Sequence, residues 1–417
     1  MQLNPVLDMP RPRSLVLRMD TTNICNLDCI GCALADSRKA FGEPAGSMKV
    51  TMFEKIVNEV FPYLSEVALS CEAEPLLHPQ FVRIMKIIAE SDHPPVRMTT
   101  NGTMFTKERL DAIFDSGIFG LSVSIDGFSP ETFARLRKNG DIHTVCEGLD
   151  EIVRRKTAAG RQAMDLPRVS INYTLMKSNF HELLPLIEYS RRWGLEDFTV
   201  THVYSTFSKD MRSECLSDLP EESDRVLIEA EKKCRECGIH PRFPALFRPS
   251  RPANTPEPGW WERLKAKLRS TPAPTPAAVP PIAAAPPEHD LACAAPWNML
   301  KIRWNGSVHP CDLWNARQPL GSLQTHSFEE IWKSEKYRDL RAGLYSGHPT
   351  FEHCLKCDRI SQDNLEKRKL TSPLAHTSIS RSNQSRDKLT SARPADCWCP
   401  DHINSGSSPN RLTGKPT

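Results

Sequence analysis

The chain has 417 residues, with 54 Lys and Arg against 51 Asp and Glu, and 39% of it is hydrophobic. This length suffices for one large domain and a small one. The near-balanced charge gives no electrostatic reason for nucleic acid to be the main partner. No apolar run reaches the roughly 20 residues that span a bilayer, and the N-terminus lacks the apolar region of a signal peptide. We therefore expect a cytoplasmic protein that binds neither nucleic acid nor a membrane.

Residues 14–204 alternate between apolar strands and amphipathic helices. The strand candidates, in chain order, are LVLRM (with 16–19 at its centre), EVALS (66–70), VRMTT (96–100), GLSVSID (120–126), VSINYTLM (169–176) and DFTVTHVY (197–204). Strands that alternate with helices favour a parallel sheet, and six such units in about 190 residues match roughly 30 residues per unit. A full barrel has eight units. The sequence therefore predicts an α/β fold, either a partial (β/α)6 barrel or an open doubly wound sheet.

The rest of the chain divides by composition. Residues 205–245 predict one further helix that ends near Gly238, and a Pro- and Ala-rich stretch then predicts a stiff linker. A small module follows, with a hairpin that turns at Asn305-Gly306 and a helix over 327–344 that begins with a capping box. The tail is rich in Ser, Asn and Arg and is expected to be disordered. The predicted parts are an N-terminal arm (1–13), a barrel domain (14–245), the linker (246–289), the small module (290–369) and the tail (370–417).

Fourteen cysteines need an explanation, and in a reducing compartment metal ligation or catalysis is a better one than disulfides. Cys25, Cys29 and Cys32 follow the first strand as C-x3-C-x2-C. A structural zinc site takes four protein ligands, and no fourth Cys or His lies near these three in sequence. Three thiolates on a four-iron cluster would leave one iron without a protein ligand. The position also fits a functional site, because barrel enzymes place their active sites on the loops that follow the strands. Free or zinc-bound cysteines remain the alternative.

The segment TTNICNLDCIGC resembles the signature loop of the radical S-adenosylmethionine (SAM) superfamily. The resemblance implies that Cys25, Cys29 and Cys32 hold a [4Fe–4S] cluster whose open iron binds SAM. An electron from this cluster would cleave SAM and yield the 5′-deoxyadenosyl radical. The family usually has an aromatic residue before the third cysteine, near the adenine, whereas this chain has Gly31, which could serve through its backbone.

Segments after later strands extend the resemblance over residues 14–204. SCEAEPLLHP is similar to the family's GGEP motif, TTNGTMF to its TNGT segment, and SVSIDGFSPETFARLR to its SIDG…R stretch. The resemblance implies that Glu74 faces the SAM amino group, that Asn101 and Ser124 make polar contacts with SAM, and that Arg137 faces the SAM carboxylate. Asn172 in the fifth strand could reach the ribose.

A second set of cysteines lies in the small module: Cys293, Cys311, Cys354 and Cys357. A C-x2-C pair with two distant cysteines is a common ligand set for zinc or for a four-iron cluster. The surrounding segment, from CAAPWNMLKIRWNGSVHPCDLW to CLKC, resembles the auxiliary-cluster module of the SPASM and twitch families. The resemblance implies a second [4Fe–4S] cluster, saturated by the four thiolates, that acts as an electron acceptor.

Together these resemblances imply a radical SAM oxidoreductase that abstracts hydrogen from an unreactive C–H bond. They leave open a small polyol, an amino sugar or another natural-product intermediate as substrate, or a ribosomally made peptide, and they imply a flavodoxin- or ferredoxin-type electron donor. The sequence does not identify a catalytic acid or base. Two other classes compete: a non-catalytic iron–sulfur electron-transfer protein and a zinc protein. Glu74, Asn101 and Ser124 argue against the electron carrier, which needs no SAM pocket.

Overall fold

The computed structural model describes residues 8–32, 42–70, 72–160, 166–203, 209–247, 293–314, 318–346, 349–355 and 357. The chain divides into two units, 1–365 and 366–417, and all described residues belong to the first. The predicted linker from residue 248 onward and the predicted tail lie outside the described residues, so these domain limits stay predictions. Within the described part, no helix is both long and apolar enough to cross a membrane.

One ten-stranded sheet organises the structure, in the order β10-β9-β8-β1-β2-β3-β4-β5-β6-β7. Its strands are β1 (Leu15–Met19), β2 (Leu64–Leu69), β3 (Val96–Thr100), β4 (Gly120–Ser124), β5 (Arg168–Leu175), β6 (Asp197–His202), β7 (His240–Arg242), β8 (Met299–Ile302), β9 (Ser307–His309) and β10 (Gly321–Ser322). All neighbours from β8 through β1 to β7 are parallel, and β8, β9 and β10 pair antiparallel. The described strands do not close into a barrel, which confirms the predicted α/β class with an open, partial barrel.

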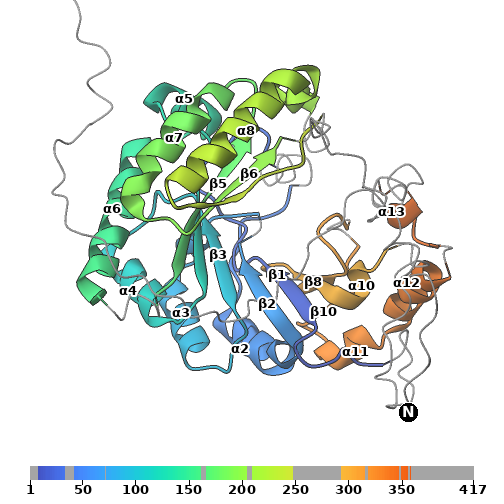
Figure 1. Cartoon of the computed structure of the whole chain (residues 1–417). Coiled ribbons are helices and arrows are strands. Elements are labelled where there is room, and N and C mark those ends of the chain that lie inside the picture. The colour runs from blue at the N-terminus through green and yellow to red at the C-terminus, as the bar shows by residue number, and fades with distance from the viewer. Residues whose placement is uncertain are drawn as a thin grey trace, which may run out of the picture. The chain divides into compact units, whose positions relative to one another are not determined.

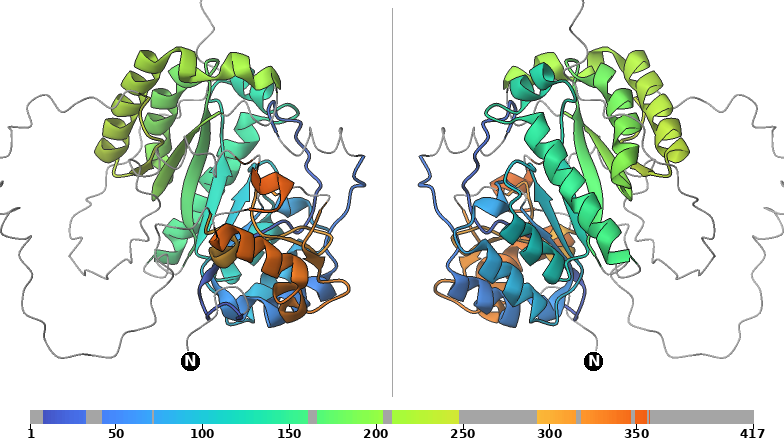
Figure 2. Two further views of the ribbon diagram at one scale, coloured as in Figure 1. Left: turned by 90° about the vertical axis from the view of Figure 1, so that its right-hand side faces the viewer. Right: turned by 90° about the vertical axis from the view of Figure 1, so that its left-hand side faces the viewer.

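Helices α2 to α8 lie along the outer side of this sheet (Figures 1 and 2). The α-helices are α2 (Val50–Glu59), α3 (Phe81–Ala89), α4 (Lys107–Asp115), α5 (Pro130–Leu136), α6 (Ile142–Ala159), α7 (Leu183–Ser190), α8 (Pro220–Glu236), α10 (Ala295–Asn298), α11 (Phe328–Trp332), α12 (Glu335–Tyr345) and α13 (Glu352–Leu355). The short 3-10 helices are η1 (Phe61–Tyr63), η2 (Pro75–Leu77), η4 (Phe180–Glu182), η5 (Arg191–Trp193), η6 (Lys209–Glu214) and η7 (Leu216–Asp218).

The two faces of the sheet differ in polarity because side chains alternate along each strand. In β1, Leu15, Leu17 and Met19 are buried in the core, and the intervening residues are half-buried. In β5 the same alternation buries four apolar side chains and leaves polar ones such as Ser170 and Asn172 half-buried. A parallel sheet covered by helices on both faces would be apolar on both. The polar face opposite the helices is therefore where a cofactor or substrate can lie.

The small module extends the main sheet instead of standing apart from it. Strand β8 pairs with β1 in register from Val16↔Met299 to Met19↔Ile302, so residues nearly 300 positions apart become neighbours. In Figure 2 the orange helices of the module lie beside the blue N-terminal elements. The predicted hairpin is confirmed as β8 and β9, with Gly306 in its turn. This pairing satisfies backbone groups that an open edge at β1 would leave exposed.

Two sequence predictions about local structure need correction. The helix predicted over 327–344 is two helices, because Ser334 caps a new one: its Oγ accepts a hydrogen bond from the Tyr337 N–H at 3.3 Å. The stretch 205–245 contains the predicted helix, α8, but also the short strand β7, which pairs with β6. Three residues that include Pro241 are a weak strand signal, and proline is tolerated there because β7 is an edge strand.

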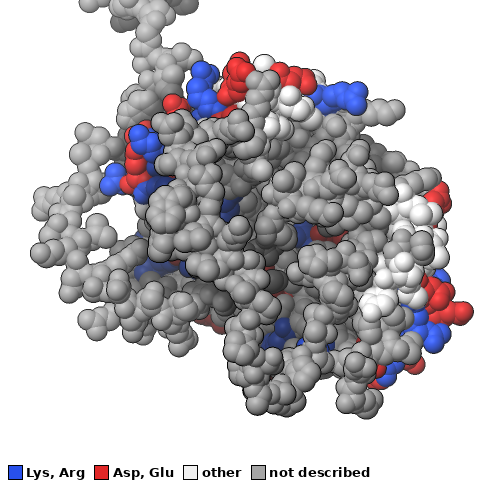
Figure 3. All heavy atoms as spheres, turned by 45° about the vertical axis from the view of Figure 1, so that its right-hand side comes forward, with Lys and Arg blue, Asp and Glu red and all other residues white. Residues whose placement is uncertain are grey.

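Charges of both signs are interspersed over the described residues of the face that Figure 3 shows. Elsewhere among the described residues, oppositely charged side chains form pairs one helical turn apart, such as Lys333 with Glu329 at 2.5 Å and Lys107 with Asp111 at 2.8 Å. Exposed pairs of this kind contribute little to stability, because water and salt screen them. The surface charge therefore agrees with the near-neutral composition.

The capping box at the start of α11 provides a test of this part of the fold. Ser327 Oγ accepts from the Glu330 N–H at 3.2 Å, and the Glu330 carboxylate accepts from the Ser327 N–H at 2.7 Å. We expect Ser327→Ala to lower the free energy of unfolding by about 1 kcal/mol, because the first turn loses its acceptor. Urea denaturation at fixed cofactor content measures this. Ser346→Ala, at a helix C-terminus, is the control and should cost less; equal losses would contradict the prediction.

Candidate functional site

The loop that carries Cys25, Cys29 and Cys32 begins after β1 and is held at several points by backbone hydrogen bonds. These bonds are Glu74 N–H to Ile24 O (3.1 Å), Asp28 N–H to Lys138 O (3.1 Å) and Ile30 N–H to Leu136 O (3.0 Å). The first partner follows β2 and the other two lie at the end of α5. The loop is thus supported from both sides at the carboxyl edge of the sheet.

The three thiols of this loop lie in one electrostatic environment. Burial raises the pKa of Cys29 to about 12; the nearby Arg137 opposes this rise, and Cys25 and Cys32 add to it. Burial also raises the pKa of Cys25, with a further contribution from Cys32. Ligation requires thiolates, so a cationic iron–sulfur core would relieve the mutual repulsion that these thiols would have when ionised. The residues present therefore fit the predicted cluster.

The Glu74 carboxylate accepts three hydrogen bonds within the protein, and its contact with the SAM amino group stays a prediction. Oε1 accepts from the Thr100 hydroxyl at 2.7 Å and from the Leu76 N–H at 3.1 Å, and Oε2 accepts from the Asn101 N–H at 2.7 Å. Its side chain is almost fully buried. Burial raises the pKa of Glu74, while these three hydrogen bonds lower it. Glu74 therefore joins the loops after β2 and β3.

Asn101 continues this network toward the first cysteine. Its Nδ2 donates to Asn26 Oδ1 at 2.9 Å and lies 3.9 Å from Cys25 Sγ. Its Oδ1 accepts from the Thr103 N–H at 2.9 Å, and Asn26 Nδ2 donates to the Thr103 hydroxyl at 2.8 Å. Asn101 therefore positions the cysteine loop, in addition to any contact with SAM.

Arg137 lies at the end of α5, beside the cysteine loop. Its guanidinium bonds the Asp126 carboxylate at 2.7 Å, and Asp126 also accepts from the Thr174 N–H at 2.7 Å. The buried Nε of Arg137 has no hydrogen-bond partner among the described residues. An unfilled donor on a buried cation suits an anionic group such as the predicted SAM carboxylate. Asp126 was missed by sequence reasoning, although it is the last residue of the fourth predicted strand, two residues beyond the end of β4.

Ser124 and Asn172 are brought side by side by the sheet. They are register partners on β4 and β5, and both are half-buried on the polar face. Their separation in sequence concealed this pairing.

Gly31 has a structural reason to be glycine. Its φ is +68°, and a Cβ built there would lie 2.7 Å from two atoms of the Met211 side chain. Left-handed backbone disfavours any residue with a Cβ, and the methionine on η6 fills the adjacent space. An aromatic residue at position 31 would need both the backbone and Met211 to move, which accounts for the departure from the family pattern.

The second set of cysteines lines one small cavity in the module. Cys293, Cys311, Cys354 and Cys357 surround it together with apolar side chains of α12, Leu340 and Leu344. Burial raises the pKa of Cys311 to about 11, with contributions from Cys293 and Cys357. All four predicted ligands are thus close together, and an apolar wall suits a cluster that must be shielded from water.

A site for a single metal ion needs a different arrangement of ligands from a site for an iron–sulfur cluster. Among the described residues, no three His, Cys, Asp or Glu side chains are grouped to hold one metal ion. Zinc draws its thiolates to about 2.3 Å, whereas a cubane binds each thiolate through a different iron and keeps the sulfurs farther apart.

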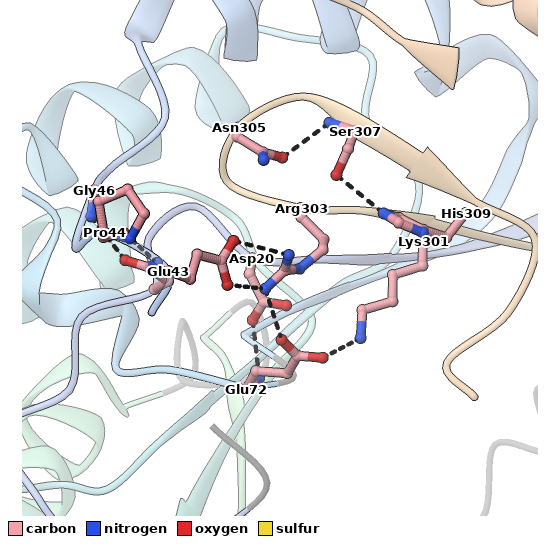
Figure 4. A network of polar contacts seen from close by, with 11 residues as sticks. Asp20, Glu43, Pro44, Gly46, Glu72, Lys301, Arg303, Asn305, Ser307 and His309 are labelled. Atoms are coloured by element: carbon pink, nitrogen blue, oxygen red, sulfur yellow. Dashed lines mark hydrogen bonds and ion pairs between the residues drawn. The ribbon is translucent and has the colours of Figure 1, made fainter. Parts of the chain in front are cut away.

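Sequence reasoning also missed a buried ionic network at the carboxyl ends of β8, β1 and β2. Figure 4 shows Lys301 and Arg303 of the hairpin directed toward Asp20, Glu43 and Glu72. Arg303 forms two bonds to Glu43, at 2.9 and 2.7 Å, and lies 3.8 Å from Glu72, which also bonds Lys301. Charged residues directly after β1 and β8 were the available signal, but nothing in the sequence placed those two strands together.

His309 adds a neutral group next to these charges. Burial, together with Arg303 and Lys301, lowers its pKa to about 3. Its Nε2 lies 3.0 Å from the Ser307 hydroxyl. The ring therefore adds no charge to the network.

Two family models match the chain. The radical SAM superfamily model matches residues 19–190, and the SPASM model, an iron–sulfur cluster-binding domain, matches residues 293–358. The chain thus contains a radical SAM domain followed by an SPASM domain. A radical SAM domain uses SAM and a [4Fe–4S] cluster, and an SPASM domain binds further iron–sulfur clusters. The cofactors predicted from the sequence, SAM and two [4Fe–4S] clusters, are thereby confirmed.

Relatives of this radical SAM protein differ in activity. GTP 3′,8-cyclase of Synechocystis sp. is 30% identical over 182 residues, which cover 43% of this chain and 51% of that protein. AdoMet-dependent heme synthase of Methanosarcina barkeri is 26% identical over 213 residues, or 51% of this chain and 56% of that one. The chain spans about half the length of the curated relatives it matches.

Solved structures share the fold. Streptococcus suis SuiB bound to S-adenosylmethionine aligns with a TM-score of 0.57 at 15% identity, over 84% of this chain and 72% of that one. Native anSMEcpe with bound AdoMet aligns with a TM-score of 0.54 at 14% identity, over 83% and 87%. At these identities the likeness concerns the fold alone.

The role of Glu74 can be tested by Glu74→Gln. The amide would place N–H donors against N–H donors of the protein, so we expect a lower melting temperature and reduced iron loading. Glu66→Gln, at an exposed ion pair, is the control. A normal melting temperature with loss of SAM binding would instead mean that the carboxylate acts on SAM directly.

The contact between Gly31 and Met211 gives a second test. We expect Gly31→Ala to destabilise the loop by at least about 1 kcal/mol from backbone strain, with faster loss of iron to a chelator. Adding Met211→Ala should restore part of the loss, because it removes the overlap but not the strain. No rescue in the double variant would show that Met211 is not the obstacle.

Proposed function

We propose that this protein is a radical SAM oxidoreductase that abstracts hydrogen from a substrate C–H bond. The observation that carries the proposal is the gathering of Cys25, Cys29 and Cys32 at the carboxyl edge of the sheet, beside Arg137, whose Nε lacks a partner among the described residues. In this proposal the three thiolates would hold the SAM-binding [4Fe–4S] cluster, which would supply the electron that cleaves SAM into methionine and the hydrogen-abstracting 5′-deoxyadenosyl radical.

Each predicted SAM contact has a defined part in this proposal. Arg137, oriented by Asp126, binds the SAM carboxylate; Ser124 and Asn172 offer polar contacts from adjacent strands. Gly31 offers its backbone, and Asn101 and Glu74 hold the loop. The helices that pack their apolar faces against the other side of the sheet give it a rigid base, so these groups are positioned before SAM binds.

We propose that Cys293, Cys311, Cys354 and Cys357 hold the auxiliary cluster, which accepts the electron that the substrate radical releases. The cavity that these four cysteines share supports this assignment. The SAM cluster would be reduced by a flavodoxin- or ferredoxin-type donor in the cytoplasm, where thiols stay reduced.

The polar face of the sheet indicates which class of substrate this protein could bind. Hydroxyl and amide side chains of β4 and β5 lie there, including Ser122, Ser124, Ser170 and Asn172. Such a surface suits a hydroxylated small molecule, and we propose a small polyol or amino sugar. A peptide is the alternative: one fold neighbour is SuiB bound to precursor peptide SuiA, and another is anSMEcpe with a bound peptide.

Anaerobic reconstitution tests the proposed function. We expect about eight irons per chain and formation of 5′-deoxyadenosine from SAM and a reductant. Cys29→Ala should halve the iron and abolish 5′-deoxyadenosine. Cys311→Ala should also lose iron yet still cleave SAM, because the SAM cluster keeps its own ligands. The control is Cys237→Ala, a half-buried cysteine outside both sets.

Three outcomes would reject the proposal. SAM cleavage that persists in Cys29→Ala would place the reactive cluster elsewhere. Iron without SAM cleavage in the unaltered protein would favour the electron-transfer protein, and zinc without iron would favour the zinc protein.

A further inference from the structure

The β8–β9 hairpin is attached at both ends to the auxiliary site. Cys293 precedes β8 and Cys311 follows β9, and both line the same cavity. A cluster bound by both residues would tie the two ends of the hairpin together. Whatever the hairpin contacts is therefore coupled mechanically to this cavity.

The residue that follows β8 reaches the radical SAM domain. The Arg303 guanidinium bonds both carboxylate oxygens of Glu43, at 2.9 and 2.7 Å, and only 6% of Arg303 is exposed (Figure 4). Next to it, the Trp304 ring lies against Gly46, where a Cβ would come within 2.1 Å of a ring atom. A two-bond arginine–carboxylate pair fixes direction as well as distance, so these contacts hold segment 42–48 in one place.

Segment 42–48 in turn holds the chain that leads into the cysteine loop. The Asn23 N–H donates to Gly46 O at 3.0 Å, and the Gly46 N–H donates to Asn23 Oδ1 at 2.7 Å. The Met48 N–H donates to Thr21 O at 2.7 Å. Cys25 follows two residues after Asn23, so a displacement of segment 42–48 would reach the first thiol.

Lys301 makes a second connection from the same hairpin. It bonds Glu72, whose own N–H donates to Asp20 Oδ1 at 2.9 Å. Glu72 and Glu74 lie on the same loop, and the Glu74 N–H holds Ile24. The two cations of the hairpin thus reach, by two routes, the segment 20–24 that leads into the cysteine loop.

We propose that Arg303 and Lys301 are positioning residues for the SAM cluster: through Glu43 and Glu72, the hairpin holds Cys25, Cys29 and Cys32 in the geometry that accepts the cluster. The auxiliary site thereby controls the stability of the SAM site. This inference rests on the proposed function for the identity of the cluster that the three cysteines hold.

Hydrogen exchange on the full chain tests the mechanical part, with or without iron. We expect Arg303→Met and Glu43→Gln to speed amide exchange in peptides that cover 19–32 and 42–48, and to leave peptides from β5 and β6 unchanged. Gly46→Ala should act in the same direction without altering a charge. Arg192→Met is the matched control, because it removes an exposed pair with Asp150 on the outer helices.

Iron chemistry tests the functional part. In reconstituted Arg303→Met we expect the SAM cluster to release iron to a chelator several-fold faster than in Arg192→Met, with a weaker change in its electron paramagnetic resonance signal when SAM is added. The auxiliary signal should persist. Arg303→Lys keeps the charge but loses the two-bond geometry, so it should fall in between.

The outcomes separate the two proposals. Exchange and iron release equal to those of the control would overturn the positioning role, even if the protein cleaves SAM normally. Absence of a SAM-cleaving cluster in the unaltered protein would overturn the proposed function, while the exchange data would still decide whether the hairpin holds the loop. If Arg303→Met fails to fold, Glu43→Gln and Gly46→Ala carry the same comparison.

Discussion

The parallel pairing of β1 with β8 is the interaction on which the arrangement of both cysteine sets depends. Strand β1 leads into the loop with Cys25, Cys29 and Cys32, and β8 belongs to the hairpin between Cys293 and Cys311. Ladder hydrogen bonds between these strands set their separation and direction. The two cysteine sets are therefore related through one continuous sheet and not through a flexible connection.

Burial of charge makes this relation specific. Lys301 and Arg303 are each only 6% exposed, and each meets a carboxylate of the radical SAM domain. A buried pair adds little net stability over apolar residues, but loss of one partner typically costs about 3–5 kcal/mol. The network thus penalises any other placement of the hairpin more than it stabilises the correct one.

Contacts between residues far apart in the chain also explain why some site residues could be recognised from the sequence and others could not. The cysteines could be recognised because thiolates at short spacing have few uses in a reducing compartment. Glu74 could be recognised by its motif, but not the three hydrogen bonds that engage its carboxylate. Their donors lie on Leu76, Thr100 and Asn101, and the sheet brings the last two to Glu74. Met211 carries no signal at all, since only the folded chain places it against Gly31.

The sequence by itself determined the α/β class, the location of the six central strands along the chain, the hairpin and the two cysteine sets, because these depend on local periodicity, turn residues and spacing. Tertiary structure alone decided that the small module would continue the sheet at β1, that Arg303 would meet Glu43, and that Arg137 would be held by Asp126. Such contacts join residues far apart in the chain, and their energies depend on distance and burial, which a linear pattern does not contain.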